Sequence, residues 1–209
     1  HVRREMKIFS GGSGSGTCYS SLRGINEPLS SGGSSSGVMS FLKIYDVSAG
    51  STKSGGKNRR AAKMVVLDAD HPEIFEFVRW KAREEEKAQM LIAAGLPPDF
   101  NGEAYDTVSG QNSNNSVRVS DEFMQAVQDD GDWSLKAVTT GQVVRTVKAR
   151  ELFREICEAA WKCADPGLQF STTINSWHTC PKNGEIRSSN PCGELFAPDN
   201  SSCNLASIN

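Results

Sequence analysis

The residue types and spacing of a catalytic set occur near the end of the chain, in Asn190, Cys192, Glu194 and Cys203. In an extended segment, side chains at alternate positions share a face, so the first three would project to one side. There a thiol could do nucleophilic or radical chemistry, a carboxylate could accept a proton and an amide could hold a hydroxyl. Cys203 follows Cys192 by eleven residues, far enough for a turn to bring it back beside Cys192. The competing interpretation is a Pro-Cys turn with a buried thiol.

Two segments of glycine and serine alone, residues 10–16 and 30–37, lie near the start of the chain. Their composition is typical of flexible linkers, but core-like sequence lies between and after them, and close approach of a backbone to a ligand also requires glycine. A third loop, residues 53–63, has five cations in eleven residues and leads into the apolar run 64–68. It lacks the P-loop spacing. Its cations and backbone N–H groups could still bind phosphate, or the loop could be a solvated basic turn.

The elements that must position these residues alternate between strands and helices. Residues 116–120 are typical of a short strand. Asp70 or His71 is expected to cap a helix that starts at Pro72, and this makes His71 a capping residue rather than a catalyst. Residues 150–163 have apolar side chains at helical spacing, which predicts that Cys157 and Cys163 lie on the core face. The alternation indicates an α/β fold.

The composition of the chain argues against several classes of protein. The 209 residues include 23 basic and 25 acidic side chains, so a formal net charge of −2 gives no global field that would recruit nucleic acid or an anionic membrane. No apolar run reaches the roughly 18 residues of a membrane span, and no signal-peptide pattern opens the chain. Six cysteines are too dilute for a disulfide scaffold and include no C-x-x-C pair, so we expect a cytoplasmic protein without a metal site of its own.

Several motifs, in order along the chain, identify a known family. The strongest is the run 189–194 together with 203–209, and the others are Gly37–Lys43, Ser54–Met64, Asp70–Ile74, Glu84–Ala88, Gln111–Val119 and Thr172–Asn175. Together they resemble ribonucleotide reductase large subunits, and more specifically the adenosylcobalamin-dependent class.

The resemblance implies a partial ten-stranded α/β barrel of the ribonucleotide reductase and glycyl-radical enzyme type, with a central finger loop. Residues 1–209 would be part of the catalytic barrel domain, incomplete at both ends. Residues 10–37 would be the Gly/Ser-rich substrate and specificity loop region, and residues 186–209 the finger loop and redox cysteine. The family's other reducing cysteine is expected on a strand that precedes His1.

The resemblance also implies a role for each member of the catalytic set. Cys192 matches the cysteine that becomes a thiyl radical and removes the 3′ hydrogen of a ribonucleotide. Glu194 matches the carboxylate that takes the 3′-hydroxyl proton, and Asn190 matches the amide that hydrogen-bonds at the ribose. Cys203 matches one of two thiols that end as a disulfide after the 2′-hydroxyl leaves as water.

Further positions match the family's binding elements. Ser13 and Gly14 match a substrate-lining stretch. Lys57, Arg59 and Arg60 lie in a loop that resembles the element through which a bound deoxynucleotide selects the base to be reduced. The implied partners are a ribonucleotide substrate, a deoxynucleotide allosteric effector and a thioredoxin-like reductant, with a homodimer in the full-length protein.

Adenosylcobalamin is the cofactor that the resemblance implies. Three alternatives stay open from the sequence. One is a reductase of the same superfamily with a tyrosyl-radical partner subunit. Another is a nucleotide-binding regulatory module without chemistry, and the last is a metal-binding structural domain that uses Cys180, Cys192 and Cys203.

Overall fold

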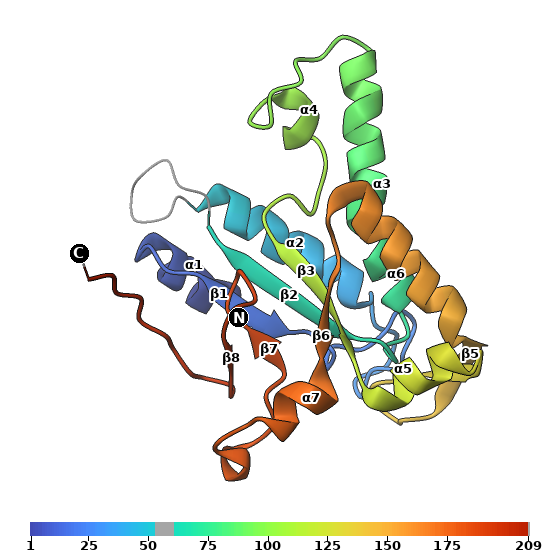
Figure 1. The fold of residues 1–209 in the computed structure, drawn as a ribbon. Helices are drawn as coiled ribbons and strands as arrows, with labels where there is room; N and C mark the ends of the chain where they lie inside the picture. The colour runs from blue at the N-terminus through green and yellow to red at the C-terminus, as the bar shows by residue number, and fades with distance from the viewer. Residues whose placement is uncertain (53–60, 209) are drawn as a thin grey trace.

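A four-stranded parallel sheet in the order β1-β2-β3-β6 forms the centre of the chain (Figure 1). The computed structural model describes residues 1–52 and 61–208. The strands are β1 Ser15–Cys18, β2 Lys63–Asp68, β3 Asn114–Val119 and β6 Gly167–Phe170. The predicted α/β class is therefore confirmed. The strand predicted at 116–120 corresponds to β3, and the apolar run 64–68 lies in β2. Within the described residues the sheet is open at both edges rather than closed into a barrel.

Helices connect the parallel strands, as a parallel sheet requires. The helices that connect successive strands of the sheet are α2 Val38–Ser51, α3 Ile74–Ala93 and α6 Ala149–Cys163. The shorter ones are α1 Val2–Ser10, α4 Glu103–Asp106, α5 Asp121–Gln128, α7 Ser171–Ser176 and a 3-10 turn at Pro181–Asn183. In the described part of the chain no helix has the length and apolar character needed to cross a membrane.

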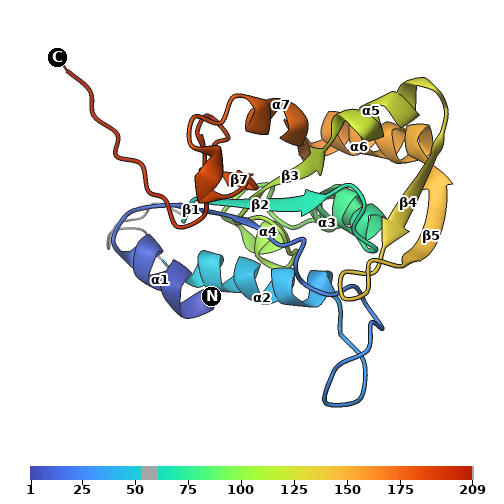
Figure 2. The same cartoon turned by 90° about the horizontal axis from the view of Figure 1, so that it is seen from below.

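Two antiparallel hairpins complete the fold. The first joins β4 Asp132–Lys136 to β5 Val143–Lys148, and the second joins β7 Ser188–Ser189 to β8 Phe196–Ala197. Figure 2 shows α1 and α2 on one side of the sheet and α7 and β7 on the other. The segment after β8 runs away from the sheet to the C-terminus (Figure 1).

The two faces of the sheet differ in composition. Because side chains alternate along a strand, each strand contributes to both faces. The helix-side face packs into the main hydrophobic core through Val65, Leu67, Val117 and Val119, which are all buried. The opposite face, here called the turn-side face, consists of small and polar residues with two apolar ones. Its members are Gly16, Cys18, Met64, Val66, Asp68, Asn114, Ser116, Arg118, Gly167 and Gln169.

The start of α3 differs from the prediction. The helix begins at Ile74, two residues after the expected start at Pro72. His71 is buried, its Nδ1 accepts a hydrogen bond from the Glu73 N–H at 3.1 Å, and its Nε2 lies 2.9 Å from the Leu22 carbonyl oxygen. The prediction that Asp70 or His71 caps the helix is therefore wrong, because Glu73 is the N-cap residue. The His71 side chain instead binds an N–H group in the turn before the helix.

The helix predicted at 150–163 is confirmed as α6, but the prediction for Cys157 is wrong. The buried stripe of α6 includes Leu152, Ile156 and Ala159. Successive helical residues are rotated by about 100° around the axis, so Cys157 points away from the stripe that Ile156 belongs to. Cys157 is exposed, whereas Cys163 is half-buried.

Candidate active site

The segment with Asn190, Cys192 and Glu194 is a closed turn between β7 and β8, not an extended strand. The Asn190 N–H donates to the Leu195 carbonyl oxygen at 3.0 Å, and the Leu195 N–H donates to the Asn190 side-chain oxygen at 3.0 Å. Gly193 reverses the chain at φ +82°, a conformation that favours glycine. The expectation that alternate residues share one face is therefore wrong, although the three side chains do lie in one turn. Residues 190–195 are called the Cys192 turn below.

Exposure differs among the four predicted catalytic residues. Cys192 and Glu194 are exposed, and Asn190 is half-buried. Cys203 is also exposed, in the segment 201–208, which has no helix or strand. The expected return of Cys203 beside Cys192 is not seen, and Cys203 is not among the residues that line the cavity below the turn.

Glycines allow the hairpin to lie directly on the sheet. A Cβ atom at Gly16 would lie 1.6 Å from the Ser189 carbonyl oxygen, and one at Gly14 would lie 2.4 Å from Cγ of Pro191. The Asn114 side-chain amide donates to the Pro191 carbonyl oxygen at 2.8 Å. The Gly/Ser segment at the start of β1 therefore serves close backbone approach, and the linker interpretation is wrong for it.

A cavity of about 530 Å³ lies between the Cys192 turn and the starts of β3 and β6. Cys192 and Phe196 line it from the hairpin, and Asn114, Ser116 and Gln169 line it from the sheet. Amide and hydroxyl groups can donate and accept hydrogen bonds, so this wall suits a small molecule that carries several hydroxyl groups. The thiol of Cys192 stands at its edge.

An ion-pair network on the turn-side face holds the chain that leads into β7. Arg118 Nε donates to Asp68 Oδ1 at 2.7 Å, and its other nitrogens contact Glu185 at 2.9 Å and the Ile186 carbonyl oxygen at 3.2 Å. Cys18 lies on the same face, where burial and then the nearby Asp68 carboxylate raise the pKa of its thiol. A thiol in this environment stays protonated near neutral pH, which gives Cys18 little reactivity.

Two of the other predicted binding residues, Ser13 and Gly14, lie between α1 and β1. Ser13 is exposed after the end of α1, and its N–H donates to the Ile8 carbonyl oxygen at 3.2 Å. Gly14 contacts both the Cys192 turn and Ala62, whose carbonyl oxygen lies 2.9 Å from the Cβ position of Gly14. Lys57, Arg59 and Arg60 lie outside the described residues.

Two buried carboxylates that the sequence analysis missed organise the loop between β1 and α2. Glu27 accepts hydrogen bonds from the N–H groups of Gly24, Val138 and Thr139 at 2.8–3.0 Å. Burial by itself would raise the pKa of Glu27, but these bonds outweigh it and hold the pKa below its usual value. Glu73 accepts from the N–H groups of Ile25 at 2.9 Å and Val38 at 2.8 Å.

The only sequence signal for these two carboxylates is the pair of glycines that they contact. A Cβ atom at Gly24 would lie 3.1 Å from the Glu27 carboxylate, and one at Gly37 would lie 2.5 Å from the Glu73 carboxylate. Gly37 also has a φ of +85°, a second reason for glycine there. The two carboxylates thus hold both ends of the loop by accepting hydrogen bonds from its N–H groups.

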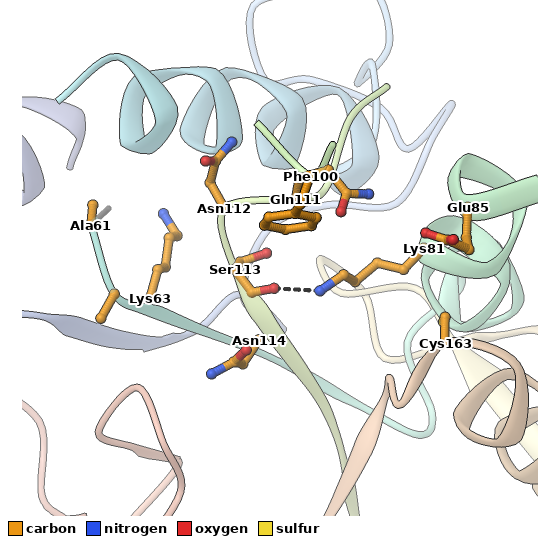
Figure 3. Close-up of a pocket in the computed structure, with 11 residues that line it drawn as sticks. Ala61, Lys63, Lys81, Glu85, Phe100, Gln111, Asn112, Ser113, Asn114 and Cys163 are labelled. Atoms are coloured by element: carbon orange, nitrogen blue, oxygen red, sulfur yellow. Dashed lines mark hydrogen bonds between the residues drawn. The ribbon is translucent and has the colours of Figure 1, made fainter. Parts of the chain in front are cut away.

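A second cavity, of about 400 Å³, lies at the starts of β2 and β3 (Figure 3). Lys81 crosses it and donates to the Ser113 carbonyl oxygen at 2.6 Å, while its ammonium group also pairs with Asp165. Asn114 and Cys163 line both this cavity and the one below the Cys192 turn. Residue types and spacing do not predict this cavity, because its walls come from segments far apart in the chain.

The described residues contain no group of three or more His, Cys, Asp or Glu side chains that could hold a metal ion. Cys180, Cys192 and Cys203 are each free and exposed. Their placement therefore does not favour the metal-binding alternative.

Comparisons with known proteins agree with the motifs. Residues 1–209 match the family described as ribonucleotide reductase, barrel domain. A vitamin B12-dependent ribonucleotide reductase of Streptomyces coelicolor is 54% identical over 207 residues, which are 99% of this chain and 21% of that protein. A protein of the same name from Bradyrhizobium diazoefficiens is 43% identical over 274 residues, with 99% of this chain and 22% of that protein covered.

A vitamin B12-dependent ribonucleoside-diphosphate reductase of Mycobacterium tuberculosis is 41% identical over 199 residues, with 95% of this chain and 25% of that protein covered. The chain thus spans about a fifth to a quarter of the length of these relatives. Because the family match extends over the whole chain, the resemblance seen in the motifs is confirmed, and the chain belongs to the ribonucleotide reductase barrel-domain family.

Proposed function

We propose that the complete protein with this chain reduces ribonucleotides to 2′-deoxyribonucleotides and so supplies precursors for DNA. The observation that carries the proposal is the Cys192 turn, which holds a thiol at the edge of a polar cavity within a ribonucleotide reductase barrel domain. Relatives named vitamin B12-dependent ribonucleotide reductase support the same activity.

Each residue of the proposed set has a chemical task. The Cys192 thiyl radical removes the 3′ hydrogen atom of the ribose, and Glu194 accepts the proton of the 3′-hydroxyl. The 2′-hydroxyl leaves as water, and two thiols, one of them Cys203, supply two electrons and two hydrogens and become a disulfide. The side-chain oxygen of Asn190 holds the turn through Leu195, and its amide nitrogen can donate to a ribose oxygen.

Adenosylcobalamin is the proposed cofactor, and when bound it supplies the organic radical that this chemistry starts from. Cys192 is an exposed free thiol, so it would be accessible to such a radical source. The names of the relatives favour this cofactor over a tyrosyl-radical partner subunit. No cobalamin-contacting residue is assigned within this chain.

The proposal includes regulation by a deoxynucleotide effector through Lys57, Arg59 and Arg60, and a substrate contact at Ser13 and Gly14. Residues 53–63, which contain these cations, are called the basic loop. The contacts of Gly14 with Pro191 and with Ala62, near the end of the basic loop, support a connection between effector and substrate. A thioredoxin-like protein would re-reduce the disulfide, which requires exposed thiols and a reducing compartment such as the cytoplasm.

A homodimer of the complete protein is also proposed, with α1 and α2 in its interface. Both helices expose large apolar side chains, and those of α2 recur every three residues at Phe41, Ile44 and Val47. The exposed large apolar residues of α1 are Met6 and Ile8. A second copy that covers this face would remove it from water, and apolar faces of this kind are typical of subunit contacts.

The test replaces Cys192 with serine in the complete protein, with Cys157→Ser as a matched control because Cys157 is also an exposed thiol. With adenosylcobalamin, a dithiol and a ribonucleotide, formation of the 2′-deoxynucleotide is measured by chromatography. Cys192→Ser should abolish it while nucleotide binding stays near wild type, because an O–H bond is too strong for this hydrogen exchange. Cys157→Ser should keep wild-type activity.

Cys203→Ser separates the two thiol roles. Hydrogen removal from the ribose could still begin, but normal reduction at the 2′ carbon could not finish, so released base is expected instead of product. Turnover by Cys192→Ser within tenfold of wild type would exclude Cys192 as the radical site.

A further inference from the structure

A buried ion pair connects α1 to the first residue of β2. Lys63 Nζ lies 2.6 Å from Glu5 Oε2, and their side chains are 1% and 2% exposed. The other oxygen of Glu5 accepts a hydrogen bond from the Ser15 hydroxyl at 2.7 Å. One carboxylate thus holds the first residue of β1 and the first residue of β2 at the same point.

Aromatic rings surround the ammonium group. Lys63 Nζ lies 4.8 Å from the ring centre of Tyr45 in α2 and 5.4 Å from that of Tyr19, which follows β1. His1 lies 3.3 Å from the Glu5 carboxylate. Burial lowers the pKa of Lys63, and the attraction of Glu5 opposes this effect. The pair is therefore surrounded by His1 before α1, Tyr45 in α2 and Tyr19 after β1.

The residues next to the pair lead directly to the candidate active site. Ala62 precedes Lys63, and its carbonyl oxygen accepts a hydrogen bond from the Ser15 N–H at 3.0 Å. Gly14 precedes Ser15 and contacts both Ala62 and Pro191 of the Cys192 turn. A shift of Lys63 relative to Glu5 would move Ala62 and Gly14, and with them the surface on which the turn rests.

We propose that the Glu5–Lys63 pair is a specificity-determining positioning element, which fixes the end of the basic loop against the support of the Cys192 turn. This inference rests on the proposed function, because its readout is the choice of base by a reductase under effector control. The two residues would not touch substrate or effector. They would set the relative position of the two segments that do.

Stability alone does not explain a pair of this kind. Removing two charges from water is costly, and replacing a buried ion pair with apolar residues of similar volume is often neutral or stabilising. Removing one partner leaves an uncompensated charge and is strongly destabilising. What apolar side chains cannot reproduce is the defined geometry, in which Glu5 directs one oxygen to Lys63 and the other to Ser15.

The experiment uses the double variant Glu5→Leu with Lys63→Met in the complete protein. Its Tm should remain close to that of the wild type, and its rate with the best effector and substrate combination should stay within about threefold. The ratio of kcat/KM for the preferred base over the next base, measured with each effector, should fall at least tenfold. This ratio does not depend on the fraction of folded protein, so a purely structural role would leave it unchanged.

Hydrogen exchange supplies a readout without activity. In the double variant the Ser15 amide, bonded to Ala62, should exchange at least tenfold faster, while the Ala69 amide, bonded to the Arg118 carbonyl oxygen at 3.0 Å, should not change. If the double variant fails to fold, Ser15→Ala and Lys63→Arg take its place in both measurements. The first should lower the ratio and the second should preserve it.

A matched control removes the exposed pair Glu86–Lys162 by Glu86→Gln with Lys162→Met, and no change in the ratio is expected. An unchanged ratio in the Glu5–Lys63 variants, whatever their Tm, would overturn the inference. If wild-type protein reduces no ribonucleotide, the proposed function fails, and unchanged exchange at Ser15 would then overturn the positioning role by itself.

Discussion

The two faces of the central sheet come from the same strands but have different structural roles. On the helix-side face, Leu67 and Val117 are fully buried against helices in one continuous apolar core. On the turn-side face, Ser116 and Gln169 are buried as well, but they meet a hairpin and the edge of a cavity. Burial alone therefore does not distinguish the faces, whereas the kind of contact does.

The energetic consequences follow from the contacts. Apolar burial is non-directional, so the helix-side face stabilises the fold without fixing any single atom. Buried polar groups must be hydrogen-bonded, and the bonds of the turn-side face have specific partners. Gln169 donates to the Ser189 hydroxyl at 3.0 Å in β7, and Arg118 holds the approach to it. The helix side thus supplies stability, and the turn side supplies placement of the Cys192 turn.

The largest effect is expected on stability, from Leu67→Ala on the helix-side face. Removing this fully buried side chain leaves a cavity and should cost about 2–5 kcal/mol of the free energy of unfolding, measured by chemical denaturation. Activity per folded molecule should not change, because the turn side is untouched. Val143→Ala in the exposed β5 is the control and should shift stability by less than about 0.5 kcal/mol. Loss of specific activity in Leu67→Ala would show that the faces are not separable.

Gly16→Ala should have the opposite profile. Its Cβ atom would lie 1.6 Å from the Ser189 carbonyl oxygen, so β7 must move away from β1. Displacement of about 1 Å at a reacting group can cost on the order of 100-fold in rate, and the deoxynucleotide assay should show a loss of that size. Gly167→Ala, on the same face, comes no closer than 3.3 Å to another atom, the Ser116 hydroxyl oxygen, and should keep most of the activity. Equal activity in the two variants would contradict the placement role.

The sequence predicted the elements better than the site. Apolar runs and helical spacing are local properties, and they located β2, β3 and α6. The face on which Cys157 lies depends on which stripe of α6 meets the core, and the single step from Ile156 to Cys157 crosses from buried to exposed. Local spacing did not resolve that step.

The geometry predicted for the site was wrong for a different reason. The Cys192 turn depends on Gly193 at φ +82° and on the hydrogen bond that the Leu195 N–H donates to the Asn190 side-chain oxygen. Both favour a turn over the extended conformation that the spacing predicted. The role of Glu27 depends on N–H groups more than 110 residues away in the turn between β4 and β5. Neither is visible from residue types and spacing, whereas the motifs still identified the family.

The smallest expected effect comes from Asn114→Ala, which removes one hydrogen bond between the sheet and the Cys192 turn. The Asn114 amide donates to the Pro191 carbonyl oxygen at 2.8 Å from an exposed position. A single neutral bond contributes about 0.5–1.5 kcal/mol, so activity should fall roughly two- to tenfold while the Tm hardly moves. Asn114→Asp keeps the size of the side chain but loses the donor, so it should resemble the alanine variant rather than the wild type. If both variants keep full activity, the glycines, rather than the hydrogen bond, determine where the turn rests on this face.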